Sequence, residues 1–505
     1  MAKEKKQEFV THITPRDEDF SQWYTDVILK TELCDYAPVR GCMIVRPYGY
    51  AIWERIQAEM DKRFKETGHQ NVYFPMLIPE SLLLKEAEHV EGFAPEVAWV
   101  TQGGTEKLQE RLAVRPTSET IFCTMYAKWV QTWRDLPMKY NQWCSVMRWE
   151  KATRPFLRTS EFLWQEGHTI HATAEEAQEE TMQMLHVYQE VAENVMALPV
   201  YVGQKSEKEK FAGARATYSM EAMMQDGKAL QAGTSHFLGQ NFAKSANISF
   251  VNKNNQQEYA YTSSWGVSTR LIGGVIMTHA DDEGMVVPPK IAPYQIVIVP
   301  VIKNDADEDA VMEYIKGLQK ELLQQAPFGE KIRIKIDKRD RKSVDKFWEW
   351  TRKGAPVILE IGPRDVAEDN VMVKERLRLG TPEGKAVVKR DEFVRTIAER
   401  LEKLQKEMFA KARARLEKNV RTDIKTKKEF EEYFANSNVW IEEGKAGKVA
   451  FVRGKWSGDP NSEELLKAMK ITIRCIPFDQ SGTKGECLLT GKQDAEIDVI
   501  YARSY

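Results

Sequence analysis

One short segment of the chain carries side chains of the kind that bind phosphate. Arg148 and Arg158 flank a loop that contains Pro155, and Glu150 follows Arg148 by two residues. The planar guanidinium of arginine donates two parallel hydrogen bonds to a phosphate group. Because side chains alternate along a strand, we expect Arg148 and Glu150 on one strand face, where the glutamate accepts from an adenine amine or orients the arginine. A surface hairpin with ion pairs is the alternative that this pattern alone leaves open.

The sequence contains neither of the common glycine-rich phosphate loops. The run from Gly485 to Lys492 has one residue too many between its glycines for a G-x-x-x-x-G-K-[ST] loop, and no G-x-G-x-x-G opens a helix. If the protein uses ATP, side chains must hold the phosphates.

The elements that position this segment belong to a first region, residues 1 to about 290, which is rich in aromatic residues and arginine. Within it, Thr173 and Glu176 have the spacing of a capping box and predict a helix over 173–198. Its apolar residues recur every three or four positions and predict one buried face: Met182, Leu185, Tyr188, Val191 and Val195.

A second region, about 291–400, alternates apolar strands with helical segments and predicts a small α/β domain. The predicted strands are 296–299, 332–336 and 357–361, and the predicted helices are 305–324 and 343–353. Pro288, Pro289 and Pro293 mark a linker before this region.

The remainder of the chain changes character again. Residues from about 391 to 434 are highly charged and predict helix, with Leu401, Leu404 and Met408 on one face, and residues 435–505 are mixed. We therefore predict a large domain over 1–290, a second over 291–400 and a C-terminal one over 401–505.

Composition gives little hint of a polyanionic partner. The 505 residues include 73 basic and 75 acidic side chains, a net charge of −2, so any nucleic acid must be held by local patches. No apolar run reaches the ~18 residues that span a bilayer, and Met1 to Phe9 lacks the apolar segment of an export signal. Six dispersed cysteines fit reduced thiols. We expect a cytoplasmic protein with no membrane partner.

Three segments in order carry a resemblance to a known family. The pattern R-W-E…P-F-L-R-T-x-E-F-L-W-Q-E-G-H, from Arg148 to His168, resembles motif 2 of the class II (IIa) prolyl-tRNA synthetases. Trp265 to Gly273 resembles motif 3. Tyr48 to Trp53, leading to Tyr73-Phe74-Pro75, resembles motif 1.

The resemblance implies a fold and a reaction. The expected fold is an α+β catalytic core, an antiparallel sheet with flanking helices, followed by an α/β anticodon-binding domain and a small α+β C-terminal domain. The expected activity joins L-proline to tRNA(Pro) through prolyl-adenylate, with ATP and Mg²⁺ as substrate. Motif 1 builds the interface of a homodimer in this family.

The resemblance also assigns residues. The T-x-E loop at Thr117 and Glu119 is expected to bind the substrate ammonium, which suits a carboxylate because charge-assisted hydrogen bonds are strong. For Phe211 or Trp164 alone, core packing is the simpler interpretation. The proline site is expected to comprise Thr117, Glu119, Trp164, Glu166, Phe211 and His236. The ATP site is expected to comprise Arg148, Glu150, Arg158, Gln231, Thr234, Ser268 and Arg270, of which the three arginines are catalytic.

The second region is similar to the class IIa anticodon-binding domain. By the resemblance, Arg341, Glu360 and Arg364 face the anticodon, where basic groups position phosphates and a glutamate accepts from a guanine edge. Taken alone, a charge run such as 338–342 is usually just a solvated face. His168 and His171 lack the i, i+4 spacing of a helical metal site, so no metal is expected there.

Two departures from relatives are informative. The four places that hold zinc ligands in zinc-bearing relatives match Ser457, Ser462, Cys487 and Thr490, so one thiolate remains and no structural zinc is expected. Motifs 2 and 3 lie only about 95 residues apart, which leaves no room for an editing insert. The ending at Tyr505 resembles the archaeal/eukaryotic-type subgroup, in which the terminal tyrosine folds back towards the active site.

Other functions stay open on the sequence. A class II core also serves ligases that never meet tRNA, which lack an anticodon domain, and silent regulatory subunits, which lose the motif arginines. A threonyl, seryl or glycyl synthetase is nearer still, but the segments E-K-E-K-F-A-G and G-T-S-H, ending at Gly213 and His236, oppose it.

Overall fold

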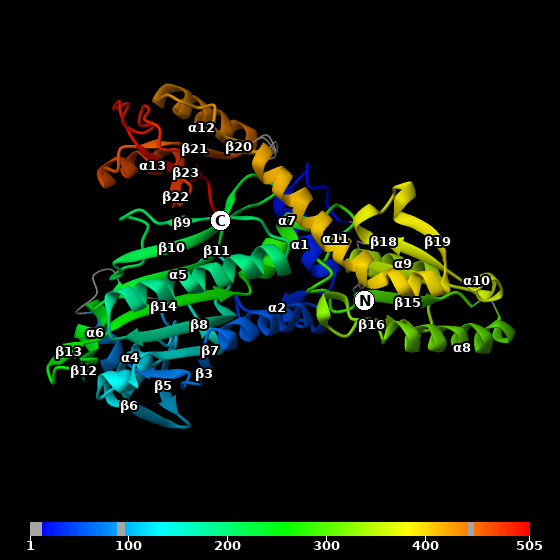
Figure 1. Ribbon diagram of the computed structural model, residues 1–505, viewed down its shortest axis with the longest axis horizontal. Helices are drawn as coiled ribbons and strands as arrows, with labels where there is room; N and C mark the ends of the chain where they lie inside the picture. Colours follow the sequence, from blue (N-terminus) through cyan, green and yellow to red (C-terminus); the bar gives the residue numbers. More distant parts are fainter. Residues whose placement is uncertain (1–12, 88–95, 303, 443–448) are drawn as a thin grey trace, which may run out of the picture. The chain divides into compact units, whose positions relative to one another are not determined.

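The computed structural model describes residues 13–87, 96–302, 304–442 and 449–505 (Figure 1). The chain forms two compact units. The small-sheet unit draws on residues up to Asp35, on Val45–Ile52 and on His279–Met408, and the large-sheet unit draws on Tyr36–Ile44, Trp53–Thr278 and Phe409–Tyr505.

An 11-stranded sheet organises the large-sheet unit (Figure 1). Its strands are, in order across the sheet, β20 (Val420–Arg421), β21 (Phe451–Trp456), β23 (Ile497–Ala502), β22 (Thr472–Pro477), β9 (Val200–Gln204), β10 (Ala216–Met223), β11 (Ala229–Gly239), β14 (Tyr261–Ser268), β8 (Glu161–His171), β7 (Met138–Met147) and β3 (Gln70–Asn71). Every pair from β21 to β7 is antiparallel, whereas the two edge strands pair in parallel. The predicted antiparallel core is confirmed.

A glycine, Gly167, leaves room in the middle of this sheet for the large side chain of the residue opposite it. Trp265 on β14 lies opposite Gly167 on β8, and its indole is almost fully buried. A Cβ atom on Gly167 would lie 2.2 Å from the indole ring. Motifs 2 and 3 therefore pack directly against each other.

Helices cover the large sheet. These are α4 (Glu119–Trp129), α5 (Ala174–Glu190), α6 (Asn241–Ala246) and α7 (Arg270–His279). The predicted helix begins where its cap places it, since the Thr173 hydroxyl accepts from Glu176 N at 3.2 Å. The Glu176 carboxylate reaches the Ala172 N–H instead of completing the box at Thr173. A π-helical turn, Val191–Val195, continues α5. The apolar face of α5 packs on β11 and β14.

A C-terminal module, which contributes strands β20 to β23, extends the large sheet that carries motifs 2 and 3. Strand β22 pairs with β9, where Ile476 lies opposite Gln204. The module has an apolar core that includes Phe430, Phe434 and Tyr501. The sheet therefore continues without a break from the module to the motif strands.

A buried ionic cluster stabilises the junction between the C-terminal module and strand β10. The Glu221 carboxylate on β10 accepts from Arg474 Nε at 3.0 Å, from Lys205 Nζ at 3.3 Å and from the Ser219 hydroxyl at 2.9 Å. Burial alone raises the pKa of Glu221, but Arg474 and Lys205 outweigh it and lower that pKa below its usual value. Glu221 is therefore ionised inside the fold because the module supplies Arg474.

The small-sheet unit holds a five-stranded mixed sheet in the order β16 (Ile334–Ile336), β15 (Ile296–Pro300), β17 (Val357–Ile361), β18 (Asn370–Glu375) and β19 (Lys385–Lys389). The first three strands run parallel and the last two form antiparallel pairs. Helices α8 (Asp305–Leu322), α9 (Ser343–Arg352) and α10 (Pro363–Glu368) pack against this sheet. The predicted α/β fold is confirmed; β18 and β19 were not predicted.

The charged region from 391 to 434 is not one helical stretch. Helix α11 (Arg390–Lys418) ends, β20 follows, and α12 (Lys427–Glu442) begins after it. The break occurs because Val420 and Arg421 pair with Phe451 and Val452, a partner distant in sequence. Leu401, Leu404 and Met408, which were predicted to share one helix face, are buried. The domain boundaries at 290 and 400 stay a prediction. None of the helices in the described ranges combines the length and apolarity of a membrane span.

Replacing Arg474 by methionine should destabilise the protein by about 3–5 kcal/mol, because it leaves the Glu221 charge buried with only part of its compensation. Arg421→Met is the matched control. It breaks an exposed pair with Asp423, at 2.6 Å, and should cost less than about 1 kcal/mol. Urea unfolding of the two variants beside the wild type measures the difference. Equal midpoints for both variants would show that the cluster does not stabilise the junction.

Candidate functional site

A cavity of about 580 Å³ lies on the large sheet, over strands β8, β11 and β14. Eleven of the residues predicted for substrate binding line it: Thr117, Glu119, Arg148, Trp164, Glu166, Phe211, Gln231, Thr234, His236, Ser268 and Arg270. These residues come from segments up to about 150 positions apart, and the central strands bring them together. Arg158 and Glu150 are not among the lining residues.

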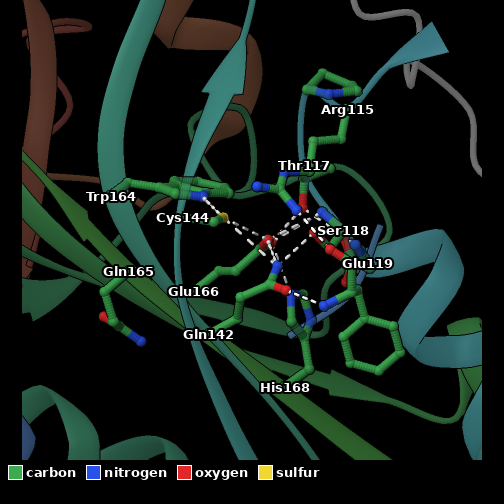
Figure 2. Close-up of polar contacts among 12 residues, drawn as sticks. Arg115, Thr117, Ser118, Glu119, Gln142, Cys144, Trp164, Gln165, Glu166 and His168 are labelled. Carbon is green, nitrogen blue, oxygen red and sulfur yellow. Dashed lines mark hydrogen bonds and ion pairs between the residues drawn. The ribbon is translucent and has the colours of Figure 1, made fainter. Parts of the chain in front are cut away.

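The carboxylate of Glu166 is the centre of a buried network at the floor of the cavity (Figure 2). Oε2 accepts from the Thr117 hydroxyl and from Ser118 N, both at 2.9 Å, and lies 3.1 Å from His168 Nε2. Oε1 accepts from Gln142 Nε2 at 3.0 Å. Glu166 therefore fixes the T-x-E loop against β7 and β8.

Electrostatics keep Glu166 ionised. Burial alone raises the pKa of a carboxyl group, but hydrogen bonds and charge from His168 and hydrogen bonds from Ser118 reverse the shift. Together they lower the pKa of Glu166 to about 2. The negative charge near Thr117 is permanent at neutral pH, which suits a site for an ammonium group.

Cys144, on β7, links this network to an aromatic wall of the cavity (Figure 2). Its Sγ accepts from the Trp164 indole Nε1 at 3.3 Å and lies 3.6 Å from Glu166 Oε1. Burial, with the charge of Glu166, raises the pKa of the Cys144 thiol to about 12. The thiol thus stays protonated and holds the indole in place.

Two arginines bring positive charge to the cavity. Arg148 donates from Nε to Pro116 O at 3.2 Å, and its guanidinium lies 5.3 Å from the centre of the Trp164 ring. Arg270, the first residue of α7, donates from Nε to Leu157 O at 3.1 Å. A backbone carbonyl therefore orients each guanidinium group, and the Trp164 ring also contacts that of Arg148.

The same arginines repel one another. Burial, and then the charges of Arg158 and Arg148, lower the pKa of Arg270. Burial likewise lowers the pKa of Arg148. Like charges that line one cavity favour a polyanionic ligand, since such a ligand relieves their repulsion.

The strand-face prediction for Arg148 and Glu150 is wrong. Strand β7 ends at Met147, so both residues lie in the connection to β8. Glu150 Oε2 lies 4.0 Å from Arg158 Nε, and half of the Arg158 side chain, 54%, is exposed. The local pattern could not reveal where β7 ends, because pairing with another strand sets that end. Its partner β8 begins only at Glu161, which lies opposite Met147.

An imidazole and a phenyl ring form the other side of the cavity. The rings of Phe211 and His236 lie 4.8 Å apart, centre to centre. His236 Nδ1 lies 2.9 Å from the hydroxyl of Thr217. Burial, and to a lesser extent the charge of His168, lower the pKa of His236 to about 3. His236 is therefore neutral at physiological pH.

Comparisons with known proteins agree with this geometry. Family models described as "tRNA synthetase class II core domain (G, H, P, S and T)", "Anticodon binding domain" and "Prolyl-tRNA synthetase, C-terminal" match residues 99–279, 295–400 and 443–505. The proline–tRNA ligase of Alkaliphilus oremlandii is 54% identical over 507 residues, and proline–tRNA ligase 2 of Clostridioides difficile is 52% identical; both alignments cover 100% of each chain.

The chain belongs to the prolyl-tRNA synthetase family. Two solved structures of the prolyl-tRNA synthetase of Cryptosporidium parvum share its fold, one complexed with halofuginone and AMPPNP and one with L-proline and AMP. Each matches with a TM-score of 0.87, at 37% and 36% identity, over 100% of this chain and 99% of that one. The two relatives named above are bacterial, so the archaeal/eukaryotic-type subgroup stays a proposal.

The predicted anticodon residues of this family member lie in the small-sheet unit. Glu360, on β17, forms an ion pair with Lys374. Arg341 donates to Glu349 at 2.8 Å, and Arg364 is exposed near the start of α10. These three residues do not belong to the cavity, and their contact with RNA stays a prediction.

Of the positions predicted to match zinc ligands of relatives, Ser457, Cys487 and Thr490 lie close together. Ser457 N donates to Cys487 Sγ at 3.3 Å, and the Ser462 hydroxyl accepts from Trp456 Nε1 at 3.0 Å. Burial raises the pKa of Cys487, but hydrogen bonds involving Thr490 and Ser457 lower it overall. Within the described residues, no three His, Cys, Asp or Glu side chains group as metal ligands would. The absence of zinc stays a prediction.

The connection between motifs 2 and 3 contains no inserted domain. Between the end of β8 and the start of β14 the chain forms α5, β9, β10, β11, α6 and two short strands, β12 (Ser249–Val251) and β13 (Gln257–Tyr259). Most of these strands belong to the sheet under the cavity.

Sequence reasoning missed Lys205, which lines the cavity, and the residues that hold the predicted ones in place: Ser118, Gln142, Cys144 and Thr217. Each carries an ordinary polar side chain outside the parts of the motifs that we interpreted. Strand register would have indicated Thr217, which lies directly opposite His236. Gln142 lies opposite Glu166 in the same way.

Acid should destabilise this protein partly through His236. The folded state keeps the imidazole neutral down to about pH 3, whereas the unfolded chain takes up a proton below 6.5, so stability falls as pH drops below 6.5. Between pH 6.5 and about pH 5 this loss amounts to about 2 kcal/mol.

The variant His236→Gln should escape that part of the loss. Thermal unfolding at about pH 7.5 and about pH 5 should show a smaller decrease in Tm for H236Q than for the wild type. His186→Gln is the control, because His186 is exposed on α5, and it should follow the wild type. Parallel decreases in all three proteins would contradict a neutral His236.

Proposed function

We propose that this protein activates L-proline with ATP to form prolyl-adenylate and transfers the prolyl group to the 3′ end of tRNA(Pro). One observation carries the proposal. A single cavity combines arginines suited to phosphates with an ionised glutamate network and aromatic walls suited to a small apolar ammonium compound. The identity of 54% to a proline–tRNA ligase over the full chain supports it.

The proline subsite uses charge for the ammonium and aromatic surface for the ring. Thr117 and Glu119 bind the ammonium, with Glu166 behind them as the fixed charge that orders their loop. Trp164 and Phe211 pack on the ring of the substrate, and a charge-assisted hydrogen bond supplies the affinity that a small ring cannot.

The ATP subsite lies at the arginines. Arg148 and Arg270 neutralise the phosphates inside the cavity, and Arg158 joins them from the motif 2 connection together with Glu150. Gln231, Thr234 and Ser268 complete the nucleotide contacts. Mg²⁺ enters with ATP as part of the substrate, and it supplies further charge neutralisation on the phosphates.

The chemistry needs positioning more than proton transfer. An oxygen of the proline carboxylate forms a bond to the α-phosphorus, the bond to the bridging β-phosphate oxygen breaks, and pyrophosphate leaves. The carboxylate is already ionised, so the site contributes orientation and fixed positive charge. A ribose hydroxyl of the tRNA then attacks the acyl carbon, loses its proton, and AMP leaves.

The proposal extends to the location, the oligomeric state and the domain organisation of the protein. The chain works in the cytoplasm as a homodimer built on motif 1, where Tyr73 is 74% and Met76 48% exposed beside Pro75. Exposed apolar side chains of this kind support an interface. The proposed domains are a catalytic one over 1–290, an anticodon-binding one over 291–400 and a C-terminal one over 401–505.

The chain also has the features of the archaeal/eukaryotic-type subgroup, although the named relatives are bacterial. The tail at Tyr505 supports this assignment: its hydroxyl donates to Asp226 at 2.5 Å and its ring lies 5.2 Å from the Arg154 guanidinium carbon. Arg154 belongs to the motif 2 connection. The short distance between motifs 2 and 3 supports the same subgroup.

Loss of Arg270 should abolish adenylate formation. Arg270→Ala removes a fixed positive charge at the phosphates, so proline-dependent ATP–pyrophosphate exchange should fall by at least about a hundredfold. Arg421→Ala, at an exposed pair in the C-terminal module, is the control and should exchange normally. Near-normal exchange by a folded R270A protein would contradict the ATP assignment.

Changes at the small sheet should separate the two half-reactions. Glu360→Ala and Arg341→Ala should leave proline-dependent exchange intact and weaken charging of tRNA(Pro), because these side chains lie in a different unit from the cavity. A lost base contact costs about 1–3 kcal/mol, or roughly 5- to 150-fold in kcat/KM for tRNA. If exchange falls as much as charging, these residues do not act on the anticodon.

A further inference from the structure

A threonine with no assigned function bonds to two residues of the proline subsite. Thr217 on β10 lies directly opposite His236 on β11, and its Oγ1 is 2.9 Å from His236 Nδ1. The same Oγ1 accepts from the backbone N–H of Phe211, also at 2.9 Å. The side chain of Thr217 is buried and lies along the cavity wall.

The two hydrogen bonds determine where the imidazole carries its proton. The Phe211 N–H already uses one lone pair of the Thr217 oxygen, and the hydroxyl hydrogen needs an acceptor. An unprotonated His236 Nδ1 is that acceptor. The opposite tautomer would turn Nδ1 into a second donor and leave the threonine hydrogen unpaired, and a buried unpaired donor is costly.

A neutral imidazole then has one hydrogen left, on Nε2. Burial keeps His236 neutral by lowering its pKa to about 3, with a smaller contribution from His168. Because Nδ1 faces Thr217, Nε2–H is the donor that His236 can offer to a ligand in the cavity. A donor suits a carboxylate oxygen of the substrate and is wrong for its ammonium group, which is itself a donor.

We propose that Thr217 is a positioning residue that locks His236 as the Nε2–H tautomer, aims this donor at the carboxylate of the bound amino acid, and ties it to the loop carrying Phe211. This inference rests on the proposed function, since it presumes an amino-acid substrate in the cavity. The contact between Thr217 and Phe211 N closes the connection between β9 and β10, so one hydroxyl sets both the ring wall and the imidazole.

The kinetic test compares Thr217→Val with Thr217→Ser. Valine keeps the shape and removes the hydroxyl, so kcat/KM for proline in pyrophosphate exchange should fall by about tenfold or more, with KM for ATP unchanged. Serine restores the hydroxyl and should recover activity to within about threefold of the wild type. Wild-type kinetics for T217V, or a serine variant as poor as valine, would overturn the proposal.

The spectroscopic test reads the tautomer without any activity. The protein has eight histidines, and nitrogen-15 spectra of their rings distinguish a protonated from an unprotonated nitrogen. The His236 signals are identified by their loss in H236Q. The wild type and T217S should show Nε2–H, and T217V should show a mixture of tautomers.

The two tests also separate this inference from the proposed function. A protonated Nδ1 in the wild-type protein would overturn the inference even if the enzyme charges tRNA normally. Absence of proline-dependent exchange in the wild type would overturn the proposed function, while the tautomer spectra would still report on Thr217.

Discussion

The buried negative charge of Glu166 is the interaction on which the cavity depends. An isolated carboxylate in the interior would take up a proton, because burial disfavours the charged form. Here donors from three segments converge on it: Thr117 and Ser118 from the loop before α4, Gln142 from β7, and His168 from β8 itself. Glu166 stays ionised only when these segments place their donors around it. The network therefore fixes the arrangement of the segments and also the negative electrostatic potential at this point of the cavity. A single buried acid thus couples the pairing of two strands to the position of the loop that binds the substrate.

The cavity brings together charges of opposite sign. Glu166 is held ionised, and Arg148 and Arg270 also line the cavity, where burial and the charges of Arg158 and Arg148 lower the pKa of Arg270. The fold arranges these charged groups before any substrate arrives. Such preorganisation matters for adenylate formation, because the charge that develops on the phosphates is met by groups that need not reorient. His236 also lines the cavity and is neutral, so it adds no charge of its own.

The sequence allowed the fold class and the lining of the cavity to be predicted, because three motifs in order specify a family whose chain covers the whole length. Periodicity located α5 and the parallel strands, since burial of one face determines those patterns. It failed where long-range pairing decides. The helical pattern through residue 420 gave no sign that Val420 pairs with Phe451, and nothing local marks the end of β7 before Arg148. The supporting residues were missed for the same reason: Thr217 acquires its role only from the residue opposite it on another strand.

Continuity of the sheet makes the C-terminal module part of the site. Lys205 lines the cavity, yet its Nζ donates both to Glu221 and, at 2.8 Å, to the backbone carbonyl of Arg474 in the module. The position of that cation is therefore set by β22, which joins β9 through Ile476 and Pro477. Glu221 also raises the pKa of Arg270 while Arg474 lowers it, so the cluster balances the charge that the ATP arginines experience. A module held by an apolar core and by strand pairing can perform this task through geometry alone, because what the cavity requires from it is a fixed backbone oxygen and one buried guanidinium.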